Sequence, residues 1–294
     1  MPENQSGALG GVVSRLFHPV KTDVLVRRFL HKKPKLIRNR TRKLTLLPTS
    51  DDIRCRLGKA ENLRAVFSGL RQCRIQADEI DDMLAAGATV CGSGMEYAYP
   101  RLASIVEEIR TGLGYRGTVS VRCYVSPPGS GFDMHYDAGA STVIQIAGRK
   151  RWWYEDRPTI VFPPSASAIQ HRVQKRPQDA KRSSLHSTYL SPGDILMLPA
   201  GTFHQAKAIT SSTSLNIAFQ VEGVRMIDML LSGIASELVR SSFWRSPHLP
   251  PAATAGKAHR KRTVSDRRIA ELHQLIDAIA KDPSFFTALY GPLT

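Results

Sequence analysis

Two hydrophobic patterns divide the chain, and the pattern in its central part is typical of β-strands. From residue 118 onward, short apolar runs rich in Val, Ile and aromatic residues are separated by Gly, Pro and Ser. This pattern favours an all-β barrel or sandwich over alternating strands and helices. We therefore predict a mainly β fold with flanking helices, built on a double-stranded β-helix, or jelly roll. The predicted strands cover 118–126, 141–148, 150–156, 158–164, 187–201, 204–211 and 214–221.

Helical spacing of apolar residues flanks this region on both sides. The segment 101–114 repeats apolar residues at helical spacing and stops at glycine. Before it, Thr49 or Ser50 precedes two acidic residues, as expected at a helix N-terminus. The helical pattern returns at 224–242 and at 265–282. These patterns predict a disordered stretch at 1–14, helical and extended elements packing on the barrel at 15–117, a catalytic core at 118–222, and C-terminal helices at 223–294 with a linker at 246–262.

The last predicted helix carries an apolar stripe that needs a partner surface. A stripe of this width on an otherwise polar helix is normally covered by another element. It either packs on the chain's own barrel or forms the contact of a homodimer, and we predict the homodimer. The stripe consists of Ile269, Leu272, Leu275, Ile276 and Ile279.

Composition indicates a cytoplasmic globular protein. Hydrophobic residues make up 42% of the 294 residues, without a run of about 18 apolar residues that would span a membrane. The first residues, "MPENQSGALGG", lack the basic and then apolar pattern of a secretory signal. The cysteines Cys55, Cys73, Cys91 and Cys123 form no C-x-x-C pair. This spacing argues against a zinc knot or a disulfide framework and favours reduced thiols.

A net charge of +16 attracts polyanions and acidic partners whatever the fold. The basic residues are concentrated at 32–43, 171–182 and 257–262. Each cluster is either a solvated surface or a binding surface for nucleic acid, the ribosome or an acidic protein.

The stretch "FDMHYDAG" places His135 and Asp137 between two strand-like segments. Residues i and i+2 of an extended chain share a face, so both side chains can reach one metal ion. The spacing alone is common by chance. The segment "SPGDILMLPAGTFHQA" then delivers His204 after a buried strand and a turn. Two imidazoles and one carboxylate form the facial triad that holds Fe(II) with three coordination positions open.

The segments 124–158 and 190–206 resemble the JmjC and cupin-type oxygenases that depend on Fe(II) and 2-oxoglutarate, particularly ribosomal-protein oxygenases and the asparaginyl hydroxylase that acts on hypoxia-inducible factor. The resemblance covers about residues 118–222. The resemblance implies that His135, Asp137 and His204 are the metal ligands. It also implies that Lys150, thirteen positions after Asp137, binds the far carboxylate of 2-oxoglutarate.

The co-substrate contacts implied by this resemblance are incomplete. Tyr124 matches a tyrosine that often touches the same carboxylate if the following loop is one residue shorter. Arg122 stands where some relatives carry an asparagine. A buried carboxylate needs a cation, which Lys150 supplies. If the strand that holds Ile144 and Ile146 continued, Lys150 would share their parity and point inward.

Four further residues carry weaker predictions. Asn216 either lines the iron pocket or is a buried amide satisfied by backbone, and Thr142 either reaches the co-substrate or is a β-branched strand former. Trp152 and Trp153 are more typical of a core than of a substrate platform.

The resemblance implies that O2 and 2-oxoglutarate are consumed while an unactivated C–H bond is hydroxylated; demethylation is the same step on an N-methyl group. We predict a protein or peptide side chain as substrate. Tailoring of a small metabolite or biosynthetic peptide and oxidation of a tRNA base are alternatives. A cupin that binds metal without oxygenase activity is a further alternative, because fold does not dictate function.

Overall fold

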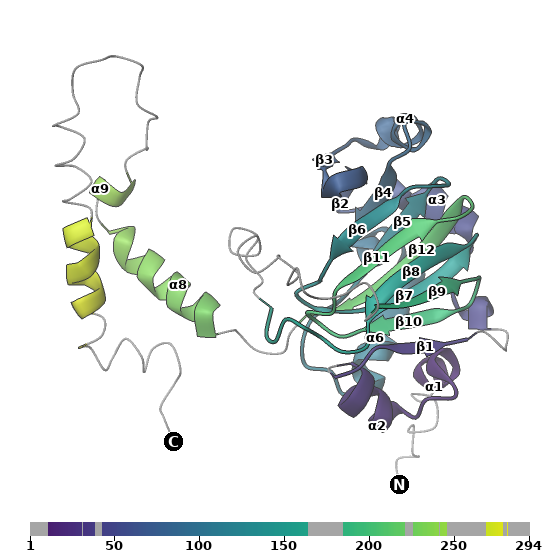
Figure 1. Cartoon of the computed structure of the whole chain (residues 1–294), viewed down its shortest axis with the longest axis horizontal. Helices are drawn as coiled ribbons and strands as arrows, with labels where there is room; N and C mark the ends of the chain where they lie inside the picture. The colour runs from purple at the N-terminus through teal and green to yellow at the C-terminus, as the bar shows by residue number, and fades with distance from the viewer. Residues whose placement is uncertain are drawn as a thin grey trace, which may run out of the picture. The chain divides into compact units, whose positions relative to one another are not determined.

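The computed structural model describes residues 11–30, 32–38, 43–163, 185–220, 226–240, 242–245, 269–278 and 281. The chain divides into two compact units, Met1–Gly223 and Val224–Thr294, which are described separately (Figure 1). The predicted linker and the basic clusters at 171–182 and 257–262 lie outside the described residues.

The first unit is built on two antiparallel sheets, which confirms the predicted jelly roll (Figure 1). The larger sheet has the order β1-β10-β7-β12-β5-β4-β2-β3 and the smaller has the order β6-β11-β8-β9. The strands of the larger sheet are β1 (Lys35–Ile37), β2 (Asn62–Val66), β3 (Gln72–Arg74), β4 (Thr89–Ser93), β5 (Val119–Ser126), β7 (Ala140–Ala147), β10 (Ile195–Leu198) and β12 (Ser212–Phe219). Those of the smaller sheet are β6 (Gly131–His135), β8 (Lys150–Glu155), β9 (Leu185–Leu190) and β11 (His204–Ala208).

Two hydrophobic clusters hold these layers together. The larger cluster lies between the large sheet and the helices, and it includes Leu16, Ile109 and Ile217. The smaller cluster joins side chains of both sheets, such as Val143 and Trp152. Because the large sheet is covered on both faces, its central strand β12 is buried along its whole length. Its apolar Leu215, Ile217 and Phe219 alternate with the polar Ser214 and Asn216, which are equally buried but face the cavity.

The helices of the first unit cover the outer face of the large sheet. Thr49 is the N-cap of α3, where its hydroxyl and the side chain of Asp52 form a capping box. Pro100 opens α6, which ends at Gly112. The helices are α1 (Gly11–Phe17), α2 (Thr22–Val24), α3 (Ser50–Leu57), α4 (Ile80–Ala85), α5 (Met95–Ala98) and α6 (Pro100–Gly112).

Three local predictions were wrong. Residues 11–14, predicted to be disordered, lie in α1, which buries Val13 and Leu16 in the core. The run 158–163 forms no strand, because its apolar Val161 and Phe162 are exposed instead of packed in a sheet. His135 was placed between strands, but it is the last residue of β6.

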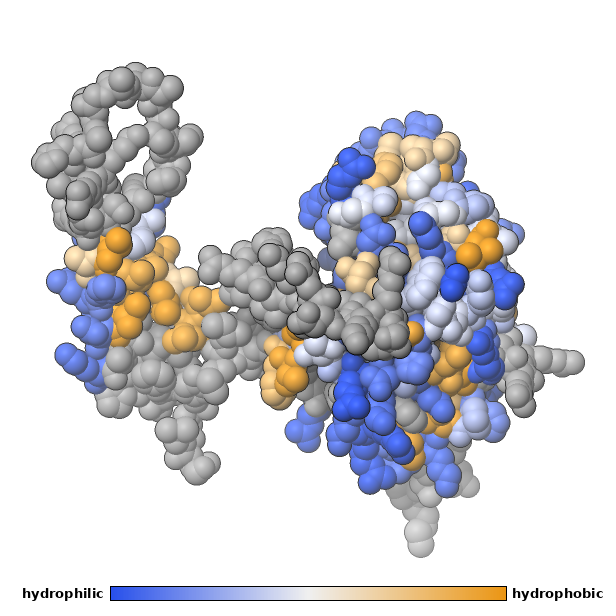
Figure 2. Space-filling view, in the orientation of Figure 1, coloured by the Kyte–Doolittle hydropathy of each residue, from blue (hydrophilic) through white to orange (hydrophobic). Residues whose placement is uncertain are grey.

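The second unit contains α8 (Met226–Leu238), α9 (Ser242–Arg245) and a helical segment at 269–278. Apolar side chains gather over α8 in Figure 2. None of the helices described in either unit is long and apolar enough to cross a membrane.

Candidate active site

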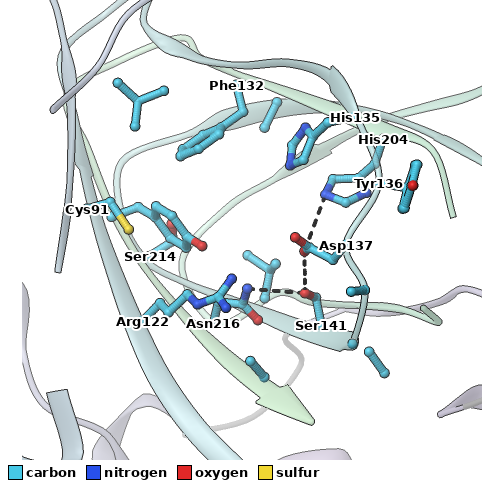
Figure 3. A pocket seen from close by; sticks show the side chains of 18 of the residues that line it. Cys91, Arg122, Phe132, His135, Tyr136, Asp137, Ser141, His204, Ser214 and Asn216 are labelled. Atoms are coloured by element: carbon cyan, nitrogen blue, oxygen red, sulfur yellow. Dashed lines mark hydrogen bonds and ion pairs between the residues drawn. The ribbon is translucent and has the colours of Figure 1, made fainter. Parts of the chain in front are cut away.

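Strand pairing brings together two histidines that lie 69 residues apart in the chain. His135 ends β6, His204 begins β11, and the two are direct partners in the antiparallel register. Their ring centroids are 4.3 Å apart. Asp137 follows β6 and turns its carboxylate toward the same point, so that Oδ2 lies 3.8 Å from Nε2 of His204 (Figure 3).

The three side chains can hold one metal ion. One ligand atom from each of His135, Asp137 and His204 lies within 4.8 Å of the other two. Nδ1 of His135 is 2.7 Å from the Asp133 carbonyl oxygen, and Nδ1 of His204 is 2.8 Å from that of Thr202. A carbonyl oxygen accepts a hydrogen bond from a protonated Nδ1, which leaves the lone pair of Nε2 in each ring free to bind a metal ion.

A chain of hydrogen bonds orients the carboxylate of Asp137. The hydroxyl of Ser141 donates to Oδ2 of Asp137 at 2.7 Å, and the Asn216 amide donates to the Ser141 hydroxyl at 3.2 Å. Burial raises the pKa of Asp137. The two imidazoles and Arg122 lower it by more than burial raises it, so the pKa lies below the usual value. The carboxyl group is therefore ionised, as a metal ligand must be.

His204 is held in its neutral form. Burial is the largest cause that lowers its pKa, to about 4, and the neighbouring His135 adds to the shift. The ring of Trp152 stacks on His204, with centroids 6.0 Å apart and an angle of 26° between the planes. Trp152 is thus part of the core behind the site, whereas Trp153 lies under the guanidinium of Arg151.

Lys150 lies in the wall of the same cavity. Its side chain is only 3% exposed, and Nζ donates to the hydroxyl of Ser214 at 3.2 Å. Burial lowers the pKa of Lys150 to about 8. Tyr124 adjoins it, with its ring centroid 5.7 Å from Nζ. Asn216 and Arg122 are partners in the pairing of β12 with β5 and lie side by side below Asp137 (Figure 3).

The cavity that these residues line has a volume of about 530 Å³. Pockets for small-molecule ligands span roughly 300–1,000 Å³. Arg64, Val66 and Gln72 extend the lining along β2 and β3. The carboxylate of Asp133 accepts a hydrogen bond from the amide of Gly69 at 2.5 Å, which ties the β2–β3 turn to β6.

The JmjC domain family matches residues 101–227, a range that contains all three proposed metal ligands and Lys150. Residues 101–227 are therefore similar to JmjC domains. The match confirms the resemblance predicted from the sequence.

Two relatives and one solved structure show which known proteins this chain is similar to. The bifunctional lysine-specific demethylase and histidyl-hydroxylase NO66 of Drosophila mojavensis is 37% identical over 106 residues, which cover 35% of this chain and 11% of that protein. The chain thus matches about a tenth of this relative's length. The uncharacterized protein YxbC of Bacillus subtilis (strain 168) is 21% identical over 268 residues, which cover 82% of this chain and 79% of YxbC. A structure of the Escherichia coli ribosomal oxygenase YcfD in complex with cobalt and 2-oxoglutarate has a TM-score of 0.55 at 18% identity, covering 93% of this chain and 70% of that one. This likeness supports the jelly-roll fold.

Two predictions made from the sequence of this region, one for Thr142 and one for Lys150, need correction. Thr142 is fully buried but does not line the cavity, because neighbouring residues of β7 face opposite sides and Ser141 and Val143 take the cavity side. The parity argument for Lys150 was also wrong, although its side chain does point inward. Ile144 and Ile146 belong to the cluster on the helix side of the large sheet. A turn separates β7 from β8, so Lys150 starts a strand of the other sheet with its own parity.

Sequence reasoning missed several polar residues of the cavity, among them Ser141, Ser214 and Arg64. Ser141 and Ser214 are two positions from Val143 and Asn216, so the alternation of the strands could have placed them. The sequence around Arg64 did not indicate a position in the cavity. Its strand, β2, is placed beside the cavity by pairing with β4, which a single sequence does not reveal.

Proposed function

We propose that the protein is an Fe(II)- and 2-oxoglutarate-dependent oxygenase that hydroxylates a side chain of a protein or peptide. The observation that carries this proposal is the combination of three convergent metal ligands with a buried lysine in one cavity. A cupin that only binds metal has no need of Lys150, because burying an ammonium group without an anionic partner is costly.

The donor set fits these groups. Two neutral imidazoles and one carboxylate are the ligands of non-haem Fe(II) oxygenases. Bound iron, together with O2 and 2-oxoglutarate, supplies the oxidation of an unactivated C–H bond while 2-oxoglutarate is converted to succinate and CO2. His135, Asp137 and His204 would hold the iron. Lys150 and Ser214 would hold the far carboxylate of 2-oxoglutarate.

The protein's own contribution is to orient these groups and exclude water. The carbonyls of Asp133 and Thr202 fix the tautomers of the two histidines. Tyr124 covers Lys150 on one side. The small cluster that contains Val143 and Trp152 seals the space between the sheets. Closing such a site against water prevents unproductive reactions.

A protein substrate is proposed because the names of two relatives describe a histidyl-hydroxylase and a ribosomal oxygenase. A ribosomal or ribosome-associated protein is therefore the proposed partner. We propose that the reaction takes place in the cytoplasm, where free thiols such as the four cysteines of this chain are normal. We also propose a homodimer formed through the C-terminal helices.

Turnover of 2-oxoglutarate tests the activity. The protein is loaded with Fe(II) and 2-oxoglutarate without oxygen and then exposed to air, and succinate is measured. We expect succinate from the natural protein and none from His135→Ala, whose metal binding should be weakened. Absence of succinate, together with normal metal binding by His135→Ala, would overturn the proposal.

A further inference from the structure

The cavity contains more positive charge than the proposed reaction uses. Among the residues that the structure describes, the cations that line it are Arg64, Arg122 and Lys150, whereas its one carboxylate belongs to Asp137. A divalent metal ion adds two positive charges, and the dianion 2-oxoglutarate removes two. With both bound, two positive charges remain without a counter-ion.

Arg122 is the surplus cation nearest to the metal ligands. It lies beside Asn216, whose amide reaches Asp137 through Ser141 (Figure 3). The pKa of Arg122 is raised, chiefly by the neighbouring Tyr124 hydroxyl and also by Asp137, so its guanidinium stays charged. In the part of the chain that the structure covers, neither Arg122 nor Lys150 forms an ion pair.

Lys150 and Arg122 occupy different rows of the cavity wall. Each row is a pair of residues that lie opposite each other on β5 and β12. Lys150 forms a hydrogen bond with Ser214, which pairs with Tyr124 in one row. Arg122 pairs with Asn216 in the next row that faces the cavity. One row can therefore hold the far carboxylate of 2-oxoglutarate while the other remains available. The guanidinium of Arg122 together with the amide of Asn216 offers several donors for the two oxygens of one carboxylate.

Arg64 extends the positive charge toward the β2–β3 side of the cavity. It pairs with Cys91 of β4, which in turn pairs with Tyr124 of β5. Two strand spacings, roughly 10 Å, therefore separate Arg64 from β5. Nε of Arg64 is buried and has no hydrogen-bond partner among the residues that the structure describes. A buried donor of this kind is costly unless a ligand satisfies it.

We propose that the substrate residue carries a carboxylate group that binds Arg122, with Arg64 receiving a second acidic group of the same substrate. This inference rests on the proposed oxygenase function and narrows its substrate to an aspartyl or glutamyl side chain, or a free acid of the same chemistry. Truncating one partner of a buried charge pair weakens binding at least about 30-fold. Arg122 therefore acts as a specificity residue.

The test compares Arg122→Asn, which introduces the residue seen in some relatives, with Lys150→Met. Binding of 2-oxoglutarate to the Mn(II)-loaded protein is measured first, by calorimetry without oxygen. We expect Arg122→Asn to keep the affinity within about threefold and Lys150→Met to lose at least about 30-fold. Equal losses in the two variants would make Arg122 a co-substrate contact and overturn the inference. Preserved affinity in Arg122→Asn also shows that this variant folds.

Substrate choice is measured next, on the Fe(II)-loaded enzyme with two peptide libraries that share random flanks. One library has a central Asp and the other a central Asn, and free carboxylic acids form a third arm. We expect a 16-dalton gain on the Asp library at least about tenfold above the Asn library, and loss of this preference in Arg122→Asn.

A 16-dalton gain on free carboxylic acids alone would support the inferred carboxylate contact but exclude a protein substrate. Succinate formation with equal gains on both libraries, or with no gain on any acidic substrate, would overturn the carboxylate inference alone. Absence of succinate would instead overturn the oxygenase function.

Discussion

Ser141 holds Asp137, one of the proposed metal ligands, in place through its hydroxyl. Outer partners of this kind typically change metal affinity 10- to 100-fold when they are removed. We therefore expect Ser141→Ala to weaken Mn(II) binding by about 10- to 100-fold, measured by competition with a chelator.

The neighbouring Thr142 provides a matched control for this experiment. Its hydroxyl is buried on the opposite face of β7, where none of the described residues forms a hydrogen bond with it. Thr142→Val should therefore leave Mn(II) affinity unchanged. Equal losses in the two variants would mean that the effect arises from packing and not from the orientation of Asp137.

Lys150 should give the binding of 2-oxoglutarate a characteristic pH dependence. Burial lowers its pKa to about 8, below the usual value of 10.5. The dianion binds the charged amine, so affinity is full below pH 8 and falls as the amine loses its proton above it. We expect the Kd of the Mn(II)-loaded protein to rise about tenfold per pH unit above pH 8.

Lys150→Arg separates this effect from general effects of alkaline pH. A guanidinium stays protonated at these pH values. The variant should therefore bind 2-oxoglutarate with an affinity that changes little between pH 7 and 9.5, as calorimetry would show. A parallel decline in the natural protein and the variant would mean that a group other than Lys150 titrates.

Residue types and spacing, together with the family resemblance, were sufficient to predict the three proposed metal ligands and Lys150. They were not sufficient to predict Arg64, the role of Arg122 or the residues that support the ligands. His135, Asp137 and His204 follow from their chemistry and their place beside predicted strands. Ser141 and Arg122 can act at the site because their side chains lie on the face of the sheet that lines the cavity. Which face a residue occupies depends on strand pairing and on turns. Thr142 was predicted for the cavity because its residue type is suitable, but its parity excludes it.

At the scale of elements, the turn between β7 and β8 determines where Lys150 points. Gly148 in this turn has φ +68°, and a Cβ there would lie 2.0 Å from the carbonyl oxygen of Ser211. The carbonyl of Arg149 accepts a hydrogen bond from the amide of Ile209 at 2.8 Å, which fixes the turn against the chain after β11. We expect Gly148→Ala to lower the free energy of unfolding by at least about 2 kcal/mol, measured by urea denaturation.

A second glycine separates backbone strain from collision. Gly87 has φ +84° but open space around it. Gly87→Ala should cost only the conformational penalty, about 1–2 kcal/mol. In Gly148→Ala the affinity for 2-oxoglutarate should also fall, because the β7–β8 turn sets the position of Lys150. Mn(II) binding should persist, because the proposed metal ligands do not lie on this turn. Equal stability losses without any change in 2-oxoglutarate affinity would refute this role of the turn.

The long apolar strands were predictable because their pattern reflects burial on both faces. Strand β6 was not, because its residues are only partly buried and their side chains form the cavity rim instead of a continuous core. Conversely, the apolar run at 158–163 has the composition of a strand, but its Val161 and Phe162 are exposed. The amide of Ile160 donates a hydrogen bond to the carbonyl of Gly201 in the turn before β11. Strand identity here depends on pairing partners, which a single sequence does not reveal.

At the scale of the whole molecule, the described residues that line the cavity all belong to the first unit. Its described helices expose apolar side chains, with Val239 57%, Ile269 51%, Ile276 45% and Leu231 40% exposed. Such surfaces are typical of contacts between protein chains. The homodimer is therefore proposed to form through this unit.

Charge added to the apolar stripe tests that proposal in the full-length protein. We expect the double variant Ile269→Glu/Ile276→Glu to be a monomer by light scattering where the natural protein is a dimer, because a buried glutamate without a partner opposes association. The control is His273→Glu/Gln274→Glu, which adds charge at exposed polar positions of the same helix and should stay dimeric. Binding of 2-oxoglutarate should persist in both variants, because the described cavity residues lie in the first unit. A natural protein that is monomeric at all concentrations, or a double variant that still dimerises, would exclude this stripe as the dimer contact.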